Sequence, residues 1–151
     1  MSYKVIEKEN YYRKGIYRHF SEDCKCSISM TGRIDVTGLA ASSKSRGTKF
    51  SLDFLYILAK VLNSREDYRM GYLWQTDQLI CYDVIHPTQY VFHEDTETCT
   101  PVYTRYDADY ELFYPAALGG SGAGKAEPGI RPGRGRPPQL VRCLVYSLVF
   151  L

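Results

Sequence analysis

The amino-acid sequence predicts a mixed α/β domain over residues 1–118, an α+β-like two-layer arrangement of helices packed on a largely antiparallel sheet. Two observations lead to this fold class. Apolar residues recur with the helical period in three segments, and short runs that alternate apolar and polar residues lie between them. The order of these segments is helix, strand, helix, several strands and helix, which is typical of a sheet covered by helices.

The N-terminal part is predicted to contain a helix followed by a strand. Asn10 can cap a helix that ends near residues 21–23. Three apolar residues at four-residue spacing share one face of this helix: Tyr12, Ile16 and Phe20. Residues 26–31 alternate apolar and polar side chains, which is the period of a half-buried strand, and we expect this strand to continue to about Val36.

The middle of the chain is predicted to hold a loop and a central helix. Residues 37–48 are small and polar, so we expect a loop with at most a short helical turn. Ser51 is a suitable cap for a helix over residues 52–62 that ends at Asn63. Its apolar stripe is broad, as in a central helix, and consists of Phe54, Leu55, Leu58, Val61 and Leu62.

Four strands and a last helix are predicted after residue 68. The strands are expected over residues 69–74, 78–82, 88–93 and 98–104, and the first two flank a short turn and form a hairpin. Pro101 indicates an edge strand or a bulge, because proline cannot donate to a ladder. Asp107 begins a helix that Pro115 is expected to cut short.

Composition changes abruptly at Leu118, which divides the chain into a body of residues 1–118 and a tail of residues 119–151. Of the 20 residues in 119–138, 16 are Gly, Pro, Arg or Ala, so this part has little to bury and is expected to be disordered or translated out of frame. The body carries a net charge of −2 and the tail +4. An acidic body argues against nucleic acid as a partner. The apolar end, residues 140–151, is too short to cross a membrane.

The five cysteines are an odd number at irregular spacing, and the first ten residues are polar and charged, unlike a secretory signal. We therefore expect reduced thiols in a cytoplasmic protein. Cys24 and Cys26 are too close for a structural zinc pair, and no second pair exists, so no metal is expected. On a strand they would face the same side and line a pocket.

Three histidines are candidate general bases. His19 lies beside an apolar stripe, which favours a partly buried, hydrogen-bonded packing role over catalysis. His86 precedes Pro87, which favours a turn. His93 begins the run His-Glu-Asp-Thr-Glu, where carboxylates are close enough to suggest a triad, although such a run between strands is usually a solvated loop. None has a nucleophile, base and orienting group arranged locally.

Two stretches carry a more specific pattern. The first contains Arg13-Lys14, His19-Phe20 and the segments 26–31 and 34–37, and the second is Tyr-Val-Phe-His-Glu-Asp-Thr-Glu-Thr at 90–98. Between them lie Lys49-Phe50, Asn63 and Arg69-Met70. In this order the chain resembles the N-terminal half of a chloramphenicol O-acetyltransferase, over about residues 5–114.

The resemblance implies an incomplete domain of the coenzyme A-dependent acyltransferase type. Such enzymes transfer the acetyl group of acetyl-CoA to a hydroxyl of chloramphenicol, which confers antibiotic resistance. They are homotrimers in which a neighbouring subunit supplies the general-base histidine of a His-His-x-x-x-Asp-Gly motif, and a serine stabilises the oxyanion. Neither the histidine pair nor that serine is found in the sequence, so we expect no catalytic residue and a truncated or frame-shifted chain that is inactive alone.

The resemblance also implies substrate-binding positions. These are Phe20, Cys24, Cys26, Ile28, Cys99 and Pro101. Cys99 stands where the family has a phenylalanine, which would loosen contact with the aromatic ring of the antibiotic. Arg13 matches a structural arginine that pairs with the aspartate of the missing motif.

Two other functions remain open. The chain could be a non-catalytic fragment that binds ligand or pairs with intact subunits. It could also associate with RNA through the arginine-glycine segment at residues 131–136 of the basic tail.

Overall fold

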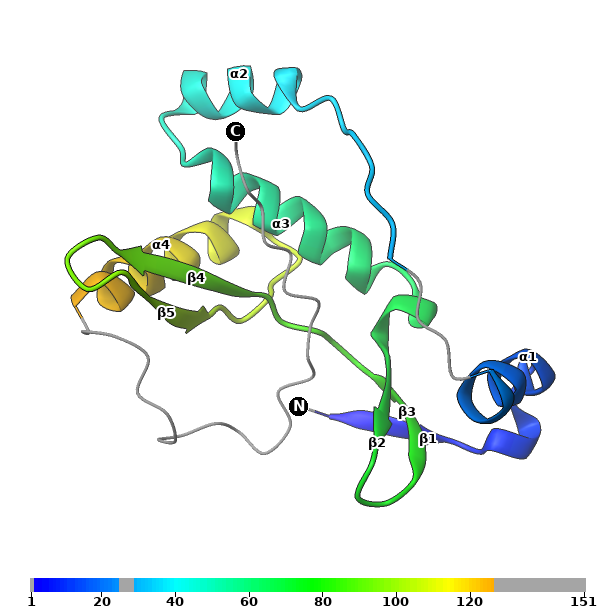
Figure 1. Ribbon diagram of the computed structural model, residues 1–151. Coiled ribbons are helices and arrows are strands. Elements are labelled where there is room, and N and C mark those ends of the chain that lie inside the picture. Colours follow the sequence, from blue (N-terminus) through cyan, green and yellow to red (C-terminus); the bar gives the residue numbers. More distant parts are fainter. Residues whose placement is uncertain (1, 25–28, 127–151) are drawn as a thin grey trace.

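The computed structural model describes residues 2–24 and 29–126 (Figure 1). Within them, three strands form an antiparallel sheet in the order β1-β3-β2: β1 (Tyr3–Ile6), β2 (Met70–Leu73) and β3 (Gln78–Tyr82). A separate antiparallel hairpin consists of β4 (Thr88–His93) and β5 (Thr98–Tyr103). The α-helices are α1 (Lys14–Arg18), α2 (Thr37–Arg46), α3 (Phe50–Asn63) and α4 (Tyr110–Ala126). The predicted class, mixed α/β with antiparallel pairing, is confirmed.

The predicted hairpin of β2 and β3 is present, and the two further predicted strands, β4 and β5, pair as a second hairpin. A strand that the sequence did not indicate joins the first hairpin. β1 pairs with β3, from Tyr3 opposite Tyr82 to Ile6 opposite Leu79. The sequence of β1, Tyr-Lys-Val-Ile, does not alternate apolar and polar residues, and most of its residues are exposed. The strand exists because β3 offers an edge for pairing.

The N-terminal predictions are partly wrong. The helix is short and continues into a π-turn, His19–Asp23, and the face that was expected to be buried is exposed: Tyr12, Ile16 and Phe20 are 71%, 62% and 48% exposed. Residues 25–28 lie outside the described residues, and residues 29–36 form no strand. In place of the predicted loop, α2 forms a ten-residue helix that ends at Gly47, whose φ of 68° suits glycine.

The core between α3 and α4 is aromatic. Its buried members are Leu52, Tyr56, Phe113 and Ala117. The hydroxyl of Tyr56 donates to the carbonyl oxygen of Ala108 at 2.6 Å, which satisfies the polar end of the ring. The face of α3 that is buried differs from the predicted stripe, since Val61 is 51% exposed and Asp53 is only 2% exposed. A periodicity argument from apolar residues could not anticipate a buried carboxylate.

Asp53 holds three helices together. Its carboxylate accepts hydrogen bonds from Ser43 at 2.5 Å, from Thr48 at 2.6 Å and from Tyr110 at 2.5 Å. The guanidinium of Arg46 lies 3.4 Å away. Burial alone would raise the pKa of Asp53, but these partners favour the ionised form and lower it. Burial and the contact with Asp53 raise the pKa of Tyr110 to about 12.

The predicted stop at Pro115 is wrong, because α4 continues through it and past Leu118 to Ala126. Proline at this position removes one helical hydrogen bond, and the second half of the helix is held by its packing on the β4–β5 hairpin. Gln89 of β4 donates to the hydroxyl oxygen of Ser121 at 2.9 Å. The division into a body and a tail stays a prediction, since residues 127–151 lie outside the described residues.

Glycines at 120 and 124 allow this close approach. A Cβ atom at Gly124 would lie 2.5 Å from Val102 and 3.3 Å from Val91, and one at Gly120 would lie 2.9 Å from Val102. Glycine content is part of the composition that predicts disorder after residue 118, yet Gly120 and Gly124 are what allow α4 to pack closely on the β4–β5 hairpin.

We predict that Gly124→Ala destabilises the protein relative to Gly122→Ala. Both changes give the same gain in helix propensity, but a Cβ at Gly122 meets nothing within 4 Å. The difference in the free energy of unfolding between the two variants, measured by urea denaturation, should be about 1–3 kcal/mol, the usual cost of overpacking. Equal stabilities would contradict the described contact between α4 and the hairpin.

We predict that Asp53→Asn lowers the free energy of unfolding at pH 7 by about 1–3 kcal/mol, since the amide cannot accept all the present hydrogen bonds. Because the folded-state pKa of Asp53 is lowered, its contribution is complete above the unfolded pKa and is lost as the pH falls through the folded one. The stability gap to wild type should therefore begin to narrow as the pH falls below about 4, and continue to narrow until the pH is below the folded-state pKa. Asp95→Asn, in an exposed turn, is the control and should follow wild type.

Candidate functional site

The first group of predicted site residues lies around α1. Arg13 precedes the helix, and its guanidinium lies 4.9 Å from the centre of the Tyr12 ring. Phe20 belongs to the π-turn and Cys24 ends it, and both are exposed. Cys26 and Ile28, the other two members of this group, lie outside the described residues.

His19 is hydrogen-bonded, as predicted, to two neighbours in the π-turn, but the prediction that it is partly buried is wrong. Its side chain is 53% exposed. Nδ1 lies 3.3 Å from the Asp23 carboxylate, and Nε2 lies 3.1 Å from Sγ of Cys24. The sequence signal that could have indicated this contact is the 19/23/24 spacing, but it requires a π-turn that no periodicity predicts.

The second group of predicted site residues, Cys99 and Pro101, lies on β5. Successive side chains of the hairpin alternate between its two faces, and Val91 and Val102 point toward α4. On the other face, Tyr90 lies opposite Pro101, and Phe92 lies opposite Cys99. Tyr90 and Phe92 are more than half exposed. Among the described strands β5 has one neighbour, so Pro101 lies on an edge strand as predicted. This apolar outer face, which we call the hairpin face, is the best-formed candidate surface for a ligand.

His93 supports the hairpin face from behind. It is 8% exposed, and Nε2 lies 2.8 Å from the hydroxyl of Thr100 on the facing strand. The acidic residues that follow it are exposed in the turn between β4 and β5. The interpretation of the turn as solvated is confirmed for residues 94–97, and the imidazole itself is part of the hairpin interior.

The described members of the two groups are not brought together within one chain. Figure 1 shows α1 at the right of the view and the β4–β5 hairpin at the left, with α3 and the three-stranded sheet between them. Within residues 2–24 and 29–126, a pocket containing Phe20, Cys24, Cys99 and Pro101 together is therefore not formed.

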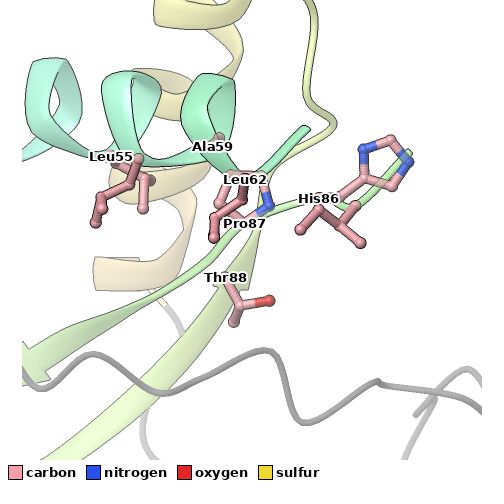
Figure 2. A pocket seen from close by; sticks show the side chains of 8 residues that line it. Leu55, Ala59, Leu62, His86, Pro87 and Thr88 are labelled. Carbon is pink, nitrogen blue, oxygen red and sulfur yellow. The ribbon is translucent and has the colours of Figure 1, made fainter. Parts of the chain in front are cut away.

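A small cavity lies between α3 and the connection from β3 to β4 (Figure 2). It is lined by Leu55, Leu58, Ala59, Leu62, Ile85, His86, Pro87 and Thr88. Its volume of about 50 Å³ is far below the roughly 300–1,000 Å³ of pockets for drug-sized ligands. His86 Nδ1 accepts the amide N–H of Tyr106 at 2.9 Å, and burial, with Arg105, lowers its pKa. This cavity is a packing feature of the core.

Asn63 fixes the connection that carries His86. Its side-chain nitrogen donates to the carbonyl oxygens of Ala59 and Ile85, and its side-chain oxygen accepts the N–H of Ile85 at 2.9 Å. The end of α3 is thereby tied to the start of the β4–β5 hairpin.

Among the described residues, no cluster of three or more His, Cys, Asp or Glu side chains is placed to bind a metal ion. No helix in the described ranges is long and apolar enough to cross a membrane. The arginine-glycine segment that suggested RNA binding lies outside the described residues.

Comparison with known proteins defines first the fold and then the family. A solved structure of a chloramphenicol acetyltransferase matches the fold with a TM-score of 0.72 at 21% sequence identity, covering 78% of this chain and 54% of that chain. A family model described as chloramphenicol acetyltransferase matches residues 1–119. The chain therefore belongs to the chloramphenicol acetyltransferase family, whose members are acyltransferases.

Curated relatives agree with this assignment. A chloramphenicol acetyltransferase from Clostridium perfringens is 32% identical over 114 residues, which are 76% of this chain and 52% of the relative. One from Escherichia coli is 29% identical over 111 residues, 74% of this chain and 50% of the relative. The chain spans about half the length of the curated relatives it matches.

Proposed function

We propose that this chain contributes acceptor-binding positions to an acetyltransferase that uses acetyl-CoA and a hydroxyl of chloramphenicol or a similar molecule. The observation that carries the proposal is the family match over residues 1–119, which includes the whole β4–β5 hairpin. The apolar hairpin face, with Tyr90, Phe92 and Pro101, suits an acceptor with an aromatic ring.

We further propose that the general base comes from another chain. A hydroxyl needs a base within about 3 Å of its proton in the reacting complex. Each histidine in the sequence has a ring nitrogen engaged elsewhere: His19 with Asp23 and Cys24, His86 with the Tyr106 N–H, and His93 with Thr100. None of these contacts is with a residue of the hairpin face.

The assembly we propose for this activity is a cytoplasmic trimer that combines this chain with intact subunits of the family, which form homotrimers by themselves. Two observations support a shared site: the two groups of predicted acceptor residues lie at opposite ends of the described structure, and the hairpin face is exposed. An acceptor bound between neighbouring subunits would be covered by both groups, from different chains.

Binding at the hairpin face can be tested with one substitution. Cys99→Phe should tighten chloramphenicol binding roughly tenfold, because a buried aromatic ring adds about 1–2 kcal/mol of contact. The dissociation constant would be measured by calorimetry. Glu111→Phe adds the same side chain at the exposed start of α4 and should leave it unchanged. Identical dissociation constants for wild type and Cys99→Phe would argue against this face as the acceptor site.

The origin of the base can be tested by turnover. We expect the purified chain, given acetyl-CoA and chloramphenicol, to release no coenzyme A thiol above background. Co-expression with the Clostridium perfringens relative should yield mixed assemblies that contain this chain. Turnover by the chain alone that is lost in His19→Gln or His93→Gln would show that the base is its own.

A further inference from the structure

The π-turn at the end of α1 places three reactive side chains in a row. The amide N–H of Cys24 donates to the carbonyl oxygen of His19 at 2.8 Å, an i→i+5 bond that inserts one residue into the turn. Residue 24 therefore lies over residue 19, next to residue 23. In a regular α-helix, positions i and i+5 would diverge around the axis.

The side chains form a chain of hydrogen-bond contacts. Sγ of Cys24 lies 3.1 Å from Nε2 of His19, and Nδ1 of His19 lies 3.3 Å from Oδ2 of Asp23. The Phe20 ring packs edge-on against the imidazole, with its centre 5.1 Å away. The neighbouring carboxylate, Glu22, instead contacts Arg18 at 3.2 Å. Asp23 is thus the carboxylate that orients His19.

This order is that of an activated nucleophile. A thiol contacts one nitrogen of an imidazole, and a carboxylate contacts the other, so a proton leaving the thiol has an acceptor and the resulting imidazolium has a counter-charge. The site is open to solvent, since His19 and Asp23 are 53% and 65% exposed and Cys24 is exposed. A small reagent can therefore reach Sγ.

The other described cysteines have different surroundings. Cys81 is 2% exposed, and its thiol lies near the carbonyl oxygens of Glu66 and Tyr82 at 3.8 and 3.7 Å. Burial raises the pKa of Cys81, which keeps it as an inert thiol. Cys99 is partly buried on β5. The contact with an oriented imidazole distinguishes Cys24 from both.

We propose that Cys24 is a reactive thiol that exchanges with small disulfides, with His19 as its proton acceptor and Asp23 as a positioning residue. The Cys24 thiol gives its proton to Nε2 of His19, and Sγ attacks one sulfur of the small disulfide. The sulfur–sulfur bond of the reagent breaks, and a new one joins Cys24 to half of the reagent. The departing thiolate takes the proton from His19, so the small disulfide is the oxidant and a small thiol is the product.

The reaction needs neither acetyl-CoA nor an acceptor alcohol, so it stands apart from the proposed acetyl transfer. Failure of one leaves the other testable.

The experiment treats the reduced full chain at pH 7 with bis(2-hydroxyethyl) disulfide. This probe is uncharged, so the carboxylates of Glu22 and Asp23 neither attract nor repel it. After alkylation of the remaining thiols and trypsin digestion, mass spectrometry gives a rate for each cysteine. Cleavage after Lys25 separates the Cys24 peptide from the Cys26 peptide. Cys24 should react at least about tenfold faster than Cys81, and His19→Gln should slow it about tenfold.

Matched variants separate chemistry from structure. Free imidazole should restore the Cys24 rate in His19→Ala, because the site is open. Asp23→Asn should lower the reaction rate of Cys24 several-fold, and Asp23→Glu should keep the rate near that of wild type. Glu22→Gln removes the same charge without a contact to His19 and should leave the rate unchanged. An equal Cys24 rate in wild type and His19→Gln would overturn the proposal. Equal effects of Asp23→Asn and Glu22→Gln would overturn the positioning role.

Discussion

The buried carboxylate of Asp53 is the constraint on which the helical part of this structure depends. A carboxylate that is 2% exposed is tolerable only when its oxygens are satisfied, and the three hydroxyls that satisfy it come from α2, from the loop after it and from α4. The requirement therefore fixes α2 and α4 against α3. At the other end of α3, Asn63 binds Ile85 through both backbone groups and fixes the start of the hairpin.

The position of the hairpin face follows from this arrangement. The hairpin is held at its start by Asn63 and along its length by α4, where Gly120 and Gly124 let the helix approach Val102. The π-turn depends on other contacts: Tyr11 reaches Met70 of β2 at 3.6 Å, just before α1. The two groups of family-implied positions are thus anchored to different sheets. This separation is the structural reason for proposing that another subunit completes the site.

Sequence patterns predicted the helices and strands that depend mainly on neighbouring residues, and missed those that depend on tertiary contacts. The β2–β3 hairpin, the strands β4 and β5 and most of α3 followed from alternation, turn residues and helical period. The strand β1 is only four residues long and exists only because β3 pairs with it. α2 is rich in serine and is stabilised through Ser43 and Asp53, a tertiary contact. α4 passes Pro115 because glycines permit packing on the hairpin. The motif pattern placed Cys24 and Cys99 as site residues, but the π-turn that joins Cys24 to His19 had no sequence signal.

Fold and chemistry make unequal demands on a sequence, and this chain illustrates the difference. The fold is shared with a solved chloramphenicol acetyltransferase at only 21% identity, because many combinations of apolar residues fill such a core. Acetyl transfer needs one lone pair aimed at one proton, and each histidine here has a ring nitrogen committed to a contact that points elsewhere. On the proposed function, the reaction is therefore a property of the assembly, to which this chain brings a surface and its partner brings the base. The π-turn is the exception, since there a histidine nitrogen and a thiol meet within one short segment.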